Sequence, residues 1–204
     1  MKEIKRLHYS RDKKIEFRDI VDVNADNFKP KGLWYSIDDA WMLWVMNEQP
    51  DWLVGYPYVR QLELNHDRIL TIPGNVASLR DLIARYGVPF GHGGGLSDFR
   101  CIDWGQIAEE YAGVEFYPYN RHLVMNFGYG KDRAEKLTTD EVFTLTFYSG
   151  VDVPSGCIWH EDGIKSFSDP VKQDVEKMQA LAEVYQRRWM DDDDDDEDPI
   201  CADS

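Results

Sequence analysis

Three short segments of the chain hold the residue types best suited to chemistry. They are Leu7-His8-Tyr9-Ser10, the stretch KGLWYS over residues 31–36, and the stretch YAGVEF over residues 111–116. A carboxylate such as that of Glu115 can stabilise a developing positive charge, and the indole of Trp34 offers a flat surface on which a ring can stack. His8 can donate a hydrogen bond to a bound hydroxyl group. Together these types suit a reaction that passes through a cationic centre.

The three segments together resemble the ADP-ribosyltransferase superfamily, in its histidine-aromatic-glutamate class of diphtheria-toxin-like and PARP-like proteins. In that class a histidine lies on the first strand, and an aromatic in a Gly-x-aromatic-aromatic-small segment opens the following helix. A glutamate begins a later strand. The order and spacing match over residues 3–160. The motifs Gly-Leu-Trp-x-Ser, Asp-Trp-x-x-Ile-Ala and Ser-Gly-Cys-Ile-Trp are also similar to those of a group of small phage and bacterial proteins.

The resemblance implies that NAD is a substrate and gives each segment a role. Glu115 would stabilise the oxocarbenium-like ribose that forms as the nicotinamide bond breaks. Trp34 would stack on the nicotinamide ring, with Tyr35 or Trp44 behind it, and His8 would donate to the adenosine ribose. The implied catalytic residues are His8, Trp34 and Glu115. The implied cofactor-binding residues are His8, Tyr9, Ser10, Trp34, Tyr35, Ser36 and Trp44.

Some positions depart from the family pattern or allow two interpretations. Tyr9, whose backbone would meet the nicotinamide carboxamide, stands where family members often have glycine. The second aromatic of the toxin-like branch lies about eleven residues beyond the first; Trp44 lies ten beyond Trp34, and Trp41 seven. Ser36 matches the small hydroxyl residue that braces the cofactor strand, and it is equally explained as the N-cap of a helix.

Each candidate also has a purely structural interpretation. A histidine beside a strand is often a satisfied core or surface residue. Trp41 and Trp44 lie at near-helical spacing, which is typical of core packing. Alternation along a strand can place Glu115 on the solvent side.

The function implied is mono-ADP-ribosyl transfer from NAD to a macromolecule with release of nicotinamide, as in a toxin or phage effector. Gly113 stands where arginine-specific relatives carry Glu or Gln, which disfavours arginine as the acceptor. The acidic chain favours a protein acceptor over DNA or RNA. Two alternatives stay open: NAD hydrolysis with water as acceptor, and a non-catalytic protein that binds a basic partner through its acidic tail.

The pattern of apolar and turn residues predicts an α+β fold with a mostly antiparallel sheet. Strands are expected over residues 3–8, 15–17, 33–35, 58–64, 69–72, 114–117, 122–126, 141–148 and 156–160. Helices are expected after Ser36-Ile37-Asp38-Asp39, over residues 76–86 behind an Asn75 cap, over 103–111, and from Asp169-Pro170 to about 190. The glycine-rich residues 91–95 are predicted to form a mobile loop.

Composition places further bounds on the chain. The formal net charge of the 204 residues is −15, and the acidic run 191–198 holds eight of these charges, which leaves −7 elsewhere. We expect one ADP-ribosyltransferase-like domain over residues 1–190 and a disordered acidic tail over 191–204. Neither a long apolar stretch nor a signal-peptide core is evident, so we expect a cytoplasmic protein without a membrane partner, in the host cytoplasm if phage-encoded.

The cysteines and their polar neighbours offer no clear metal or thiol chemistry. The three cysteines are odd in number and lack metal-ligand spacing, so they are expected to be free thiols. Asp152, Cys157, His160 and Glu161 lie close in sequence, but they match no zinc pattern and no base is paired with the thiol. We therefore assign this region to closure of the fold.

Overall fold

The computed structural model describes residues 3–15, 17–24, 29–89, 99–121, 123 and 138–180. Its strands are β1 (Arg6–Ser10), β2 (Leu33–Ile37), β3 (Tyr58–Leu64), β4 (Ile69–Ile72), β5 (Gly87–Pro89), β6 (Arg100–Ile102), β7 (Gly113–Phe116), β8 (Ser155–Ile158), β9 (Ile164–Phe167) and β10 (Val171–Lys172). Its helices are α1 (Ala40–Glu48), α2 (Trp52–Gly55), α3 (Val76–Tyr86), α4 (Trp104–Ala108) and α6 (Thr139–Leu145). Short 3-10 turns are η1 (His66–Arg68), η2 (Thr146–Gly150) and η3 (Glu161–Gly163).

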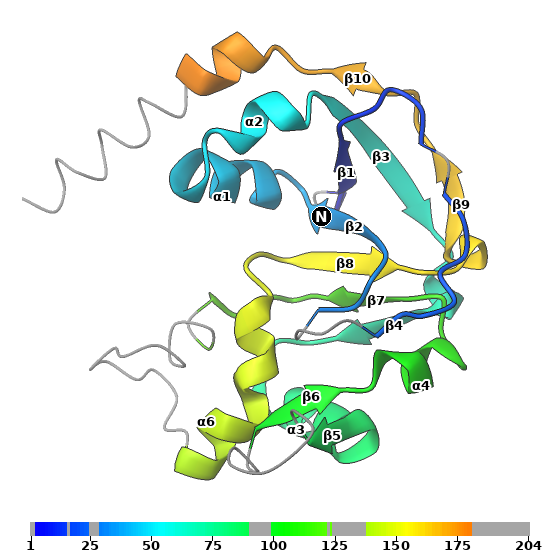
Figure 1. Cartoon of the computed structure of the whole chain (residues 1–204), viewed down its shortest axis with the longest axis vertical. Helices are drawn as coiled ribbons and strands as arrows, with labels where there is room; N and C mark the ends of the chain where they lie inside the picture. The colour runs from blue at the N-terminus through cyan, green and yellow to red at the C-terminus, as the bar shows by residue number, and fades with distance from the viewer. Residues whose placement is uncertain are drawn as a thin grey trace, which may run out of the picture.

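One large sheet forms the centre of the molecule, with the strand order β10-β3-β1-β2-β8-β7-β4 and with β9 also paired to β3 (Figure 1). Every ladder in it is antiparallel except that between β4 and β7. A parallel pair requires a long crossover, and here the crossover consists of α3, the small β5-β6 sheet and α4. The predicted α+β class with a mostly antiparallel sheet is confirmed.

Two groups of helices cover one face of this sheet at opposite ends of the molecule (Figure 1). At one end α1 and α2 pack Met42, Val45 and Leu53 against Tyr9 of β1. At the other end α3, α4 and α6 build a larger core that includes the residues Leu79, Ile107, Leu145, Val114, Phe116 and Cys157. The opposite face of the sheet carries a smaller apolar cluster made by the residues Leu33, Tyr35, Ile37, Leu62, Leu64, Ile69 and Ile158.

Elements with strong local signals are confirmed. β3 and β4 have the predicted bounds, because alternating or continuous apolar residues lie between clear turns. Asn75 caps α3 as predicted, since its Oδ1 accepts a hydrogen bond from the Ser78 amide at 2.9 Å. α4 also begins where expected, with Asp103 Oδ1 accepting from the Gln106 amide at 3.2 Å, but it ends at Ala108 rather than near Tyr111.

The strand predicted over residues 141–148 is wrong, because the segment forms α6 and η2. Its β-branched and aromatic residues favour a strand, but a capping box fixes the start of a helix. The Thr138 amide donates to the Glu141 carboxylate at 2.7 Å, and the Glu141 amide donates to the Thr138 hydroxyl at 3.3 Å. This local pairing outweighs the strand propensity.

One predicted helix start and one predicted helix cap are also wrong, although α1 begins at Ala40, directly after Asp39, as expected. Val171 and Lys172, just after Pro170, form the edge strand β10; the helix begins later, at Val175, where the Asp174 carboxylate accepts from the Lys177 amide at 3.1 Å. Ser36 belongs to β2 and caps no helix, since its hydroxyl donates to the Asp38 carbonyl at 3.1 Å. No side-chain cap bond is present at Asp39, which precedes α1.

The remaining predicted elements differ in part or lie outside the described residues. The first strand spans Arg6–Ser10 rather than 3–8, and Ile15 and Phe17 are not in a strand. Residues 91–95, most of 122–126, and everything beyond 180 lie outside the described residues, although Leu123 is described and is helical. None of the described helices is long and apolar enough to cross a membrane.

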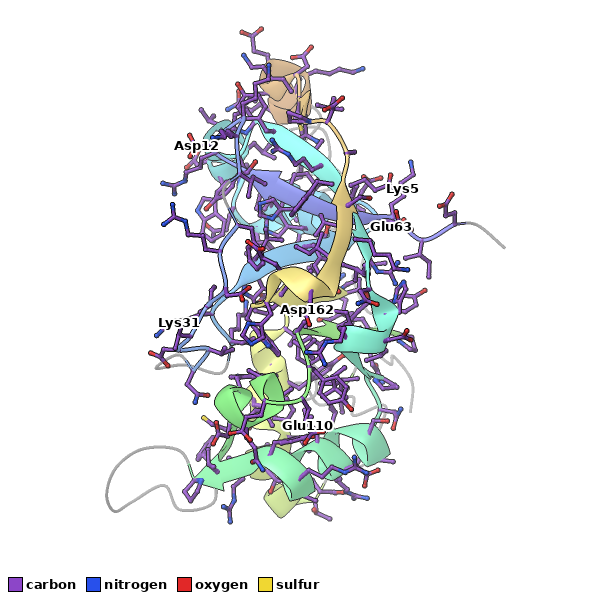
Figure 2. The ribbon with its side chains drawn as sticks, turned by 90° about the vertical axis from the view of Figure 1, so that its right-hand side faces the viewer. Lys5, Asp12, Lys31, Glu63, Glu110 and Asp162 are labelled. Carbon is purple, nitrogen blue, oxygen red and sulfur yellow. The ribbon has the colours of Figure 1, made fainter. Side chains whose placement is uncertain are left out.

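One surface arginine, Arg68, links the end of the crossover to η3 through an ion pair and a hydrogen bond. The Arg68 guanidinium, between η1 and β4, donates to the Asp162 carboxylate at 2.8 Å and to the Glu110 carbonyl at 2.7 Å. Asp162 and Glu110 lie on the side of the molecule that faces the reader in Figure 2. These contacts join η3 and the end of α4 to the start of β4.

A glycine in β8 leads to a testable prediction about sheet packing. A Cβ added at Gly156 would overlap the Tyr35 phenol ring and would lie 2.6 Å from the Val114 carbonyl oxygen. We expect Gly156→Ala to lower the free energy of unfolding by about 3 kcal/mol in a urea titration, because backbone atoms cannot move aside. Gly55→Ala is the control: nothing lies within 4 Å of its added Cβ, so stability should be unchanged or slightly higher. Equal stability of both variants would contradict this packing.

Candidate functional site

Strand register places the predicted catalytic residues on two different faces of the sheet. Trp34 of β2 lies opposite Cys157 of β8, which lies opposite Val114 of β7. Tyr35, the next residue, lies opposite Gly156, which lies opposite Glu115. Residues directly opposite one another share a face, and neighbours along a strand alternate. Trp34 and Glu115 therefore point to opposite sides of the sheet.

Glu115 is buried, with 3% of its surface exposed, and its side chain lies on the face of the sheet opposite to that of Trp34. The Arg6 guanidinium donates to both of its carboxylate oxygens, at 2.7 and 3.1 Å, and the Tyr35 hydroxyl donates at 2.9 Å. Burial alone would lower the pKa of Arg6, but the hydrogen bonds and charge of Glu115 outweigh it and raise that pKa. Burial, and then Glu115, raise the pKa of Tyr35 well above its usual range. The carboxylate is fully engaged in holding three strands together.

His8 belongs to the same face as Glu115 and is engaged by the backbone. Its Nδ1 lies 2.6 Å from the carbonyl oxygen of Trp34, and since that oxygen can only accept, Nδ1 is the donor. Burial, and to a lesser extent the charge of Arg60, lower the pKa of His8. The neutral ring acts as a brace between β1 and β2.

A cleft lined by tryptophans lies on the other face, between α1, α2 and the segment that leads into β8. Its volume is about 240 Å³. The aromatic residues that line it are Tyr9, Trp34, Tyr35, Trp41, Trp44 and Trp52. Ring contacts join them in pairs: Tyr9 and Trp41 have centroids 4.7 Å apart, and Trp44 and Trp52 meet edge to face at 5.9 Å. Such a cleft offers several flat surfaces to a bound ring.

Local structure explains why these tryptophans border a cleft instead of the core. In α1 the fully buried stripe consists of Met42, Val45 and Met46, which leaves Trp41 and Trp44 half-buried at its margins. The buried face of α1 is therefore not the one that contains Trp41 and Trp44, whose spacing in the sequence is typical of core packing. Trp34 is held at the floor of the cleft because its indole N–H donates to the Pro30 carbonyl at 3.2 Å.

Lys29 and Asp152 are the two charged residues of the described cleft lining. The Lys29 ammonium lies 2.6 Å from the Asp152 carboxylate and 5.8 Å from the centroid of the Trp34 ring. The Tyr119 hydroxyl donates to the carbonyls of Val151 and Asp152, at 2.8 and 3.0 Å, and so fixes the segment that carries the carboxylate. An acid and an ammonium group thus meet over an aromatic surface.

A neighbouring hollow of about 380 Å³ continues from the cleft, since Trp44, Asp152 and Val153 line both. It adds polar and charged groups from Asn47 and Glu48 of α1 and from Arg121. Asp152 therefore stands between two connected spaces. Their combined size falls within the roughly 300–1,000 Å³ that is common for small-molecule sites.

The structure thus brings together five of the seven predicted cofactor-binding residues and leaves the others apart. Tyr9, Trp34, Tyr35, Ser36 and Trp44 line the cleft. Tyr35 borders it although its hydroxyl bonds Glu115 on the opposite face. His8 and Ser10 are not among the lining residues, and the Ser10 hydroxyl donates to the Asp12 carbonyl at 3.0 Å.

Sequence reasoning missed Lys29 and Asp152 as site residues. In the sequence, Asp152 lies close to Cys157 in a region that we assign to closure of the fold. Cys157 is fully buried, and burial raises the pKa of its thiol, so it stays protonated. Asp152 and Lys29 are 123 residues apart, and only the pairing of β8 with β2 brings them together. The described residues include no cluster of His, Cys, Asp or Glu that could hold a metal ion.

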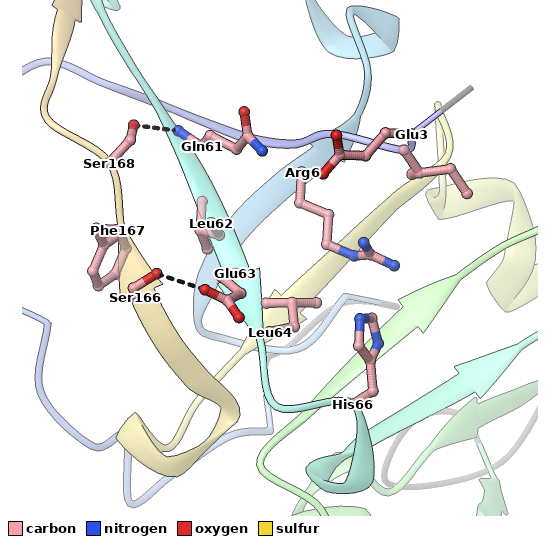
Figure 3. Close-up of a pocket in the computed structure, with 11 residues that line it drawn as sticks. Glu3, Arg6, Gln61, Leu62, Glu63, Leu64, His66, Ser166, Phe167 and Ser168 are labelled. Carbon is pink, nitrogen blue, oxygen red and sulfur yellow. Dashed lines mark hydrogen bonds between the residues drawn. The ribbon is translucent and has the colours of Figure 1, made fainter. Parts of the chain in front are cut away.

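A wider hollow of about 840 Å³ lies at the other side of the sheet, where β3 extends beyond its ladder with β1 (Figure 3). Polar and charged residues line much of it, among them Glu3, Arg6, Gln61, Glu63, His66 and Ser166 (Figure 3). None of the predicted cofactor-binding residues lines this hollow. Arg6 reaches from it toward Glu115, which connects the hollow to the buried ion pair.

Comparison of the chain with protein-family models, with curated proteins and with solved structures found no match.

The buried ion pair predicts a large effect on stability. We expect Glu115→Gln to lower the free energy of unfolding by about 3 kcal/mol, because the Arg6 charge loses its partner in a mostly buried place. Removing both groups in Arg6→Gln/Glu115→Gln should recover at least about 1 kcal/mol of that loss. Glu63→Gln, an exposed control on β3, should change stability by less than about 0.5 kcal/mol in the same chemical denaturation. Additive single and double variants would disprove the coupling.

The lowered pKa of His8 predicts how stability depends on pH. The unfolded chain takes up a proton near the ordinary histidine pKa of 6.5, whereas the folded chain resists protonation until lower pH. Stability should therefore fall as pH drops below about 6.5, by at most about 1.4 kcal/mol for each unit of the shift. Denaturation midpoints measured between about pH 7 and pH 5 should show a smaller slope in His8→Gln. An unchanged slope in that variant would rule His8 out as the cause.

Proposed function

We propose that the chain is an NAD-dependent ADP-ribosyltransferase that binds the nicotinamide end of NAD in the tryptophan-lined cleft and passes ADP-ribose to a macromolecule. The observation that carries the proposal is the gathering of five predicted cofactor-binding residues in one cleft, beside a carboxylate. They come from three strands or helices: β1 supplies Tyr9, β2 supplies Trp34, Tyr35 and Ser36, and α1 supplies Trp44.

The cleft suits a nicotinamide ring for a simple physical reason. The ring of NAD is flat and positively charged, and aromatic faces attract such a cation more strongly than they attract a neutral ring. Trp34 and Trp44 offer two faces that do not depend on each other for support, because Trp34 bonds Pro30 and Trp44 contacts Trp52. Rings held in fixed positions can keep the glycosidic bond at one angle for cleavage.

In this proposal Asp152 takes the part that the resemblance assigns to Glu115. Glu115 is on the opposite face, and its oxygens already accept hydrogen bonds from Arg6 and Tyr35. The Asp152 side chain is 40% exposed and lines both the cleft and the neighbouring hollow. A carboxylate at that boundary lies where positive charge would develop on the ribose as nicotinamide departs.

The rest of the NAD molecule would extend into the neighbouring hollow. Its pyrophosphate carries negative charge, and Arg121 is the cation that lines this hollow, opposite in charge to Glu48 of the same lining. The acceptor would approach Asp152 from the open side; a protein side chain is preferred over a nucleic acid because of the net negative charge of the chain.

The test follows nicotinamide release and transfer of labelled ADP-ribose after incubation with NAD and a cell lysate. We expect Asp152→Asn to lower nicotinamide release at saturating NAD by about 100-fold or more, because it keeps the shape and loses the charge. Asp22→Asn is the matched control, since Asp22 also pairs with a lysine, Lys31 at 2.9 Å, but outside the cleft. Its activity should equal that of the unmodified chain.

Other outcomes discriminate between the alternatives. Full activity in Asp152→Asn together with none in a folded Glu115→Gln protein would return the catalytic part to Glu115. Nicotinamide release without label on a macromolecule would indicate NAD hydrolysis. No NAD binding at all would eliminate both enzyme proposals and leave the acidic residues 191–198 as the feature to study, by deletion of 191–204.

A further inference from the structure

We propose that the tryptophan-lined cleft selects its ligand by positive charge: it is a site for a planar organic cation, which takes the place of the Lys29 ammonium. The inference deepens the proposed function, because the nicotinamide ring of NAD is such a cation, and it rests on that function only for the name of the ligand. The preference for a planar cation follows from the residues of the cleft and does not depend on NAD being the ligand.

The position of Lys29 shows what the cleft accommodates. Its ammonium group lies within 6 Å of the Trp34 ring centroid, at 5.8 Å, which is the distance range of a cation-π contact. The same group lies 2.6 Å from the Asp152 carboxylate. One positive charge thus makes both kinds of favourable contact that the cleft can offer a cation.

The surroundings favour a flat cation over the lysine itself. Trp41 and Trp44 of α1 and Trp52 of α2 stand around the same space, and each can add a ring face or edge to a planar ligand. A lysine side chain presents a small charged tip, whereas a planar cation spreads its charge over a ring that can contact several of these surfaces at once. Burial of the ligand ring against the aromatic walls therefore adds to the binding free energy that the charge contacts supply.

Competition between Lys29 and the ligand has a consequence for specificity. A cation that displaces the ammonium group takes over its contacts with Trp34 and Asp152, and Lys29 moves into solvent, where it is well hydrated. A neutral ring must either leave Lys29 in place or leave Asp152 without a partner. The cleft thus discriminates between a pyridinium ring and the same ring without the charge, such as an oxidised nicotinamide and a neutral one.

The experiment uses two ligands that differ in this charge: nicotinamide, which is neutral, and ring-methylated nicotinamide, which is a pyridinium cation. Binding is followed in isotope-labelled full-length protein through the indole N–H resonances of its tryptophans. Trp34, Trp41, Trp44 and Trp52 report on the cleft, while Trp104 and Trp159, buried to 2% and 0% exposure in the other core, serve as internal references.

We expect the cation to shift the cleft resonances with a dissociation constant at least about fivefold lower than that of nicotinamide. Lys29→Met should tighten binding of the cation by about tenfold, because the internal competitor is gone, and Asp152→Asn should weaken it by a similar factor. Lys31→Met is the matched control: it changes the net charge by the same amount, but Lys31 pairs with Asp22 outside the cleft, so binding should not change.

Equal affinity for the two ligands, or unchanged affinity of the cation in Lys29→Met, would overturn the inference. An equal gain in Lys31→Met would show attraction to the overall negative charge and would also overturn it. The binding test of this inference and the activity test of the proposed function can give independent results. Selective binding of the cation without NAD cleavage would support the inference and contradict the proposed enzymatic function. NAD cleavage without selective binding of the cation would support the enzymatic function and contradict the inference.

Discussion

The contact on which the rest of the sheet depends is the buried group of Arg6, Tyr35 and Glu115. It joins β1, β2 and β7 through charge-assisted hydrogen bonds of 2.7 to 3.1 Å, and it crosses β8 at the one position where no side chain stands in the way, Gly156. A shift of β1 or β7 by one residue would turn Arg6 or Glu115 to the opposite face and separate the two charges, and a shift of β2 would remove the Tyr35 hydroxyl from the group. The group therefore holds the register of four strands.

The tryptophan-lined cleft is a consequence of that register. Because Tyr35 and Glu115 occupy one face, Trp34 must face the other, where α1 and α2 leave room between themselves and the segment before β8. The carboxylate that lines the cleft together with Trp34 is then that of Asp152 and not that of Glu115. A residue type that suits a reaction is useful only on the face where the substrate can lie, and neighbouring positions on a strand differ completely in this respect.

Local signals in the sequence were sufficient for some elements and not for others. β3, β4 and α3 were predicted with the correct bounds, because their signals act within a few residues. These signals are the apolar pattern of the two strands, and for α3 the Asn75 cap at its start and Gly87 at its end. α6 was missed because its strand-like composition concealed the Thr138 and Glu141 capping box. The aromatic half of the cleft could be predicted, since Trp34 and Trp44 flank one strand-to-helix junction. Asp152 could not, because its place depends on where a distant strand enters the sheet.

That late entry has a consequence for the order in which the protein becomes functional. The aromatic walls of the cleft come from Tyr9 and residues 34–52, whereas Asp152 follows about a hundred residues later, just before β8, which enters the middle of the sheet between β2 and β7. Closing so long a loop around a central strand is entropically costly and slow compared with forming the earlier ladders of β1 with β2 and β3. On the ribosome, an emerging chain would display the tryptophans of the cleft well before it possessed the acid beside them. In terms of the proposed function, the chain would thus stay inactive until β8 has joined the sheet.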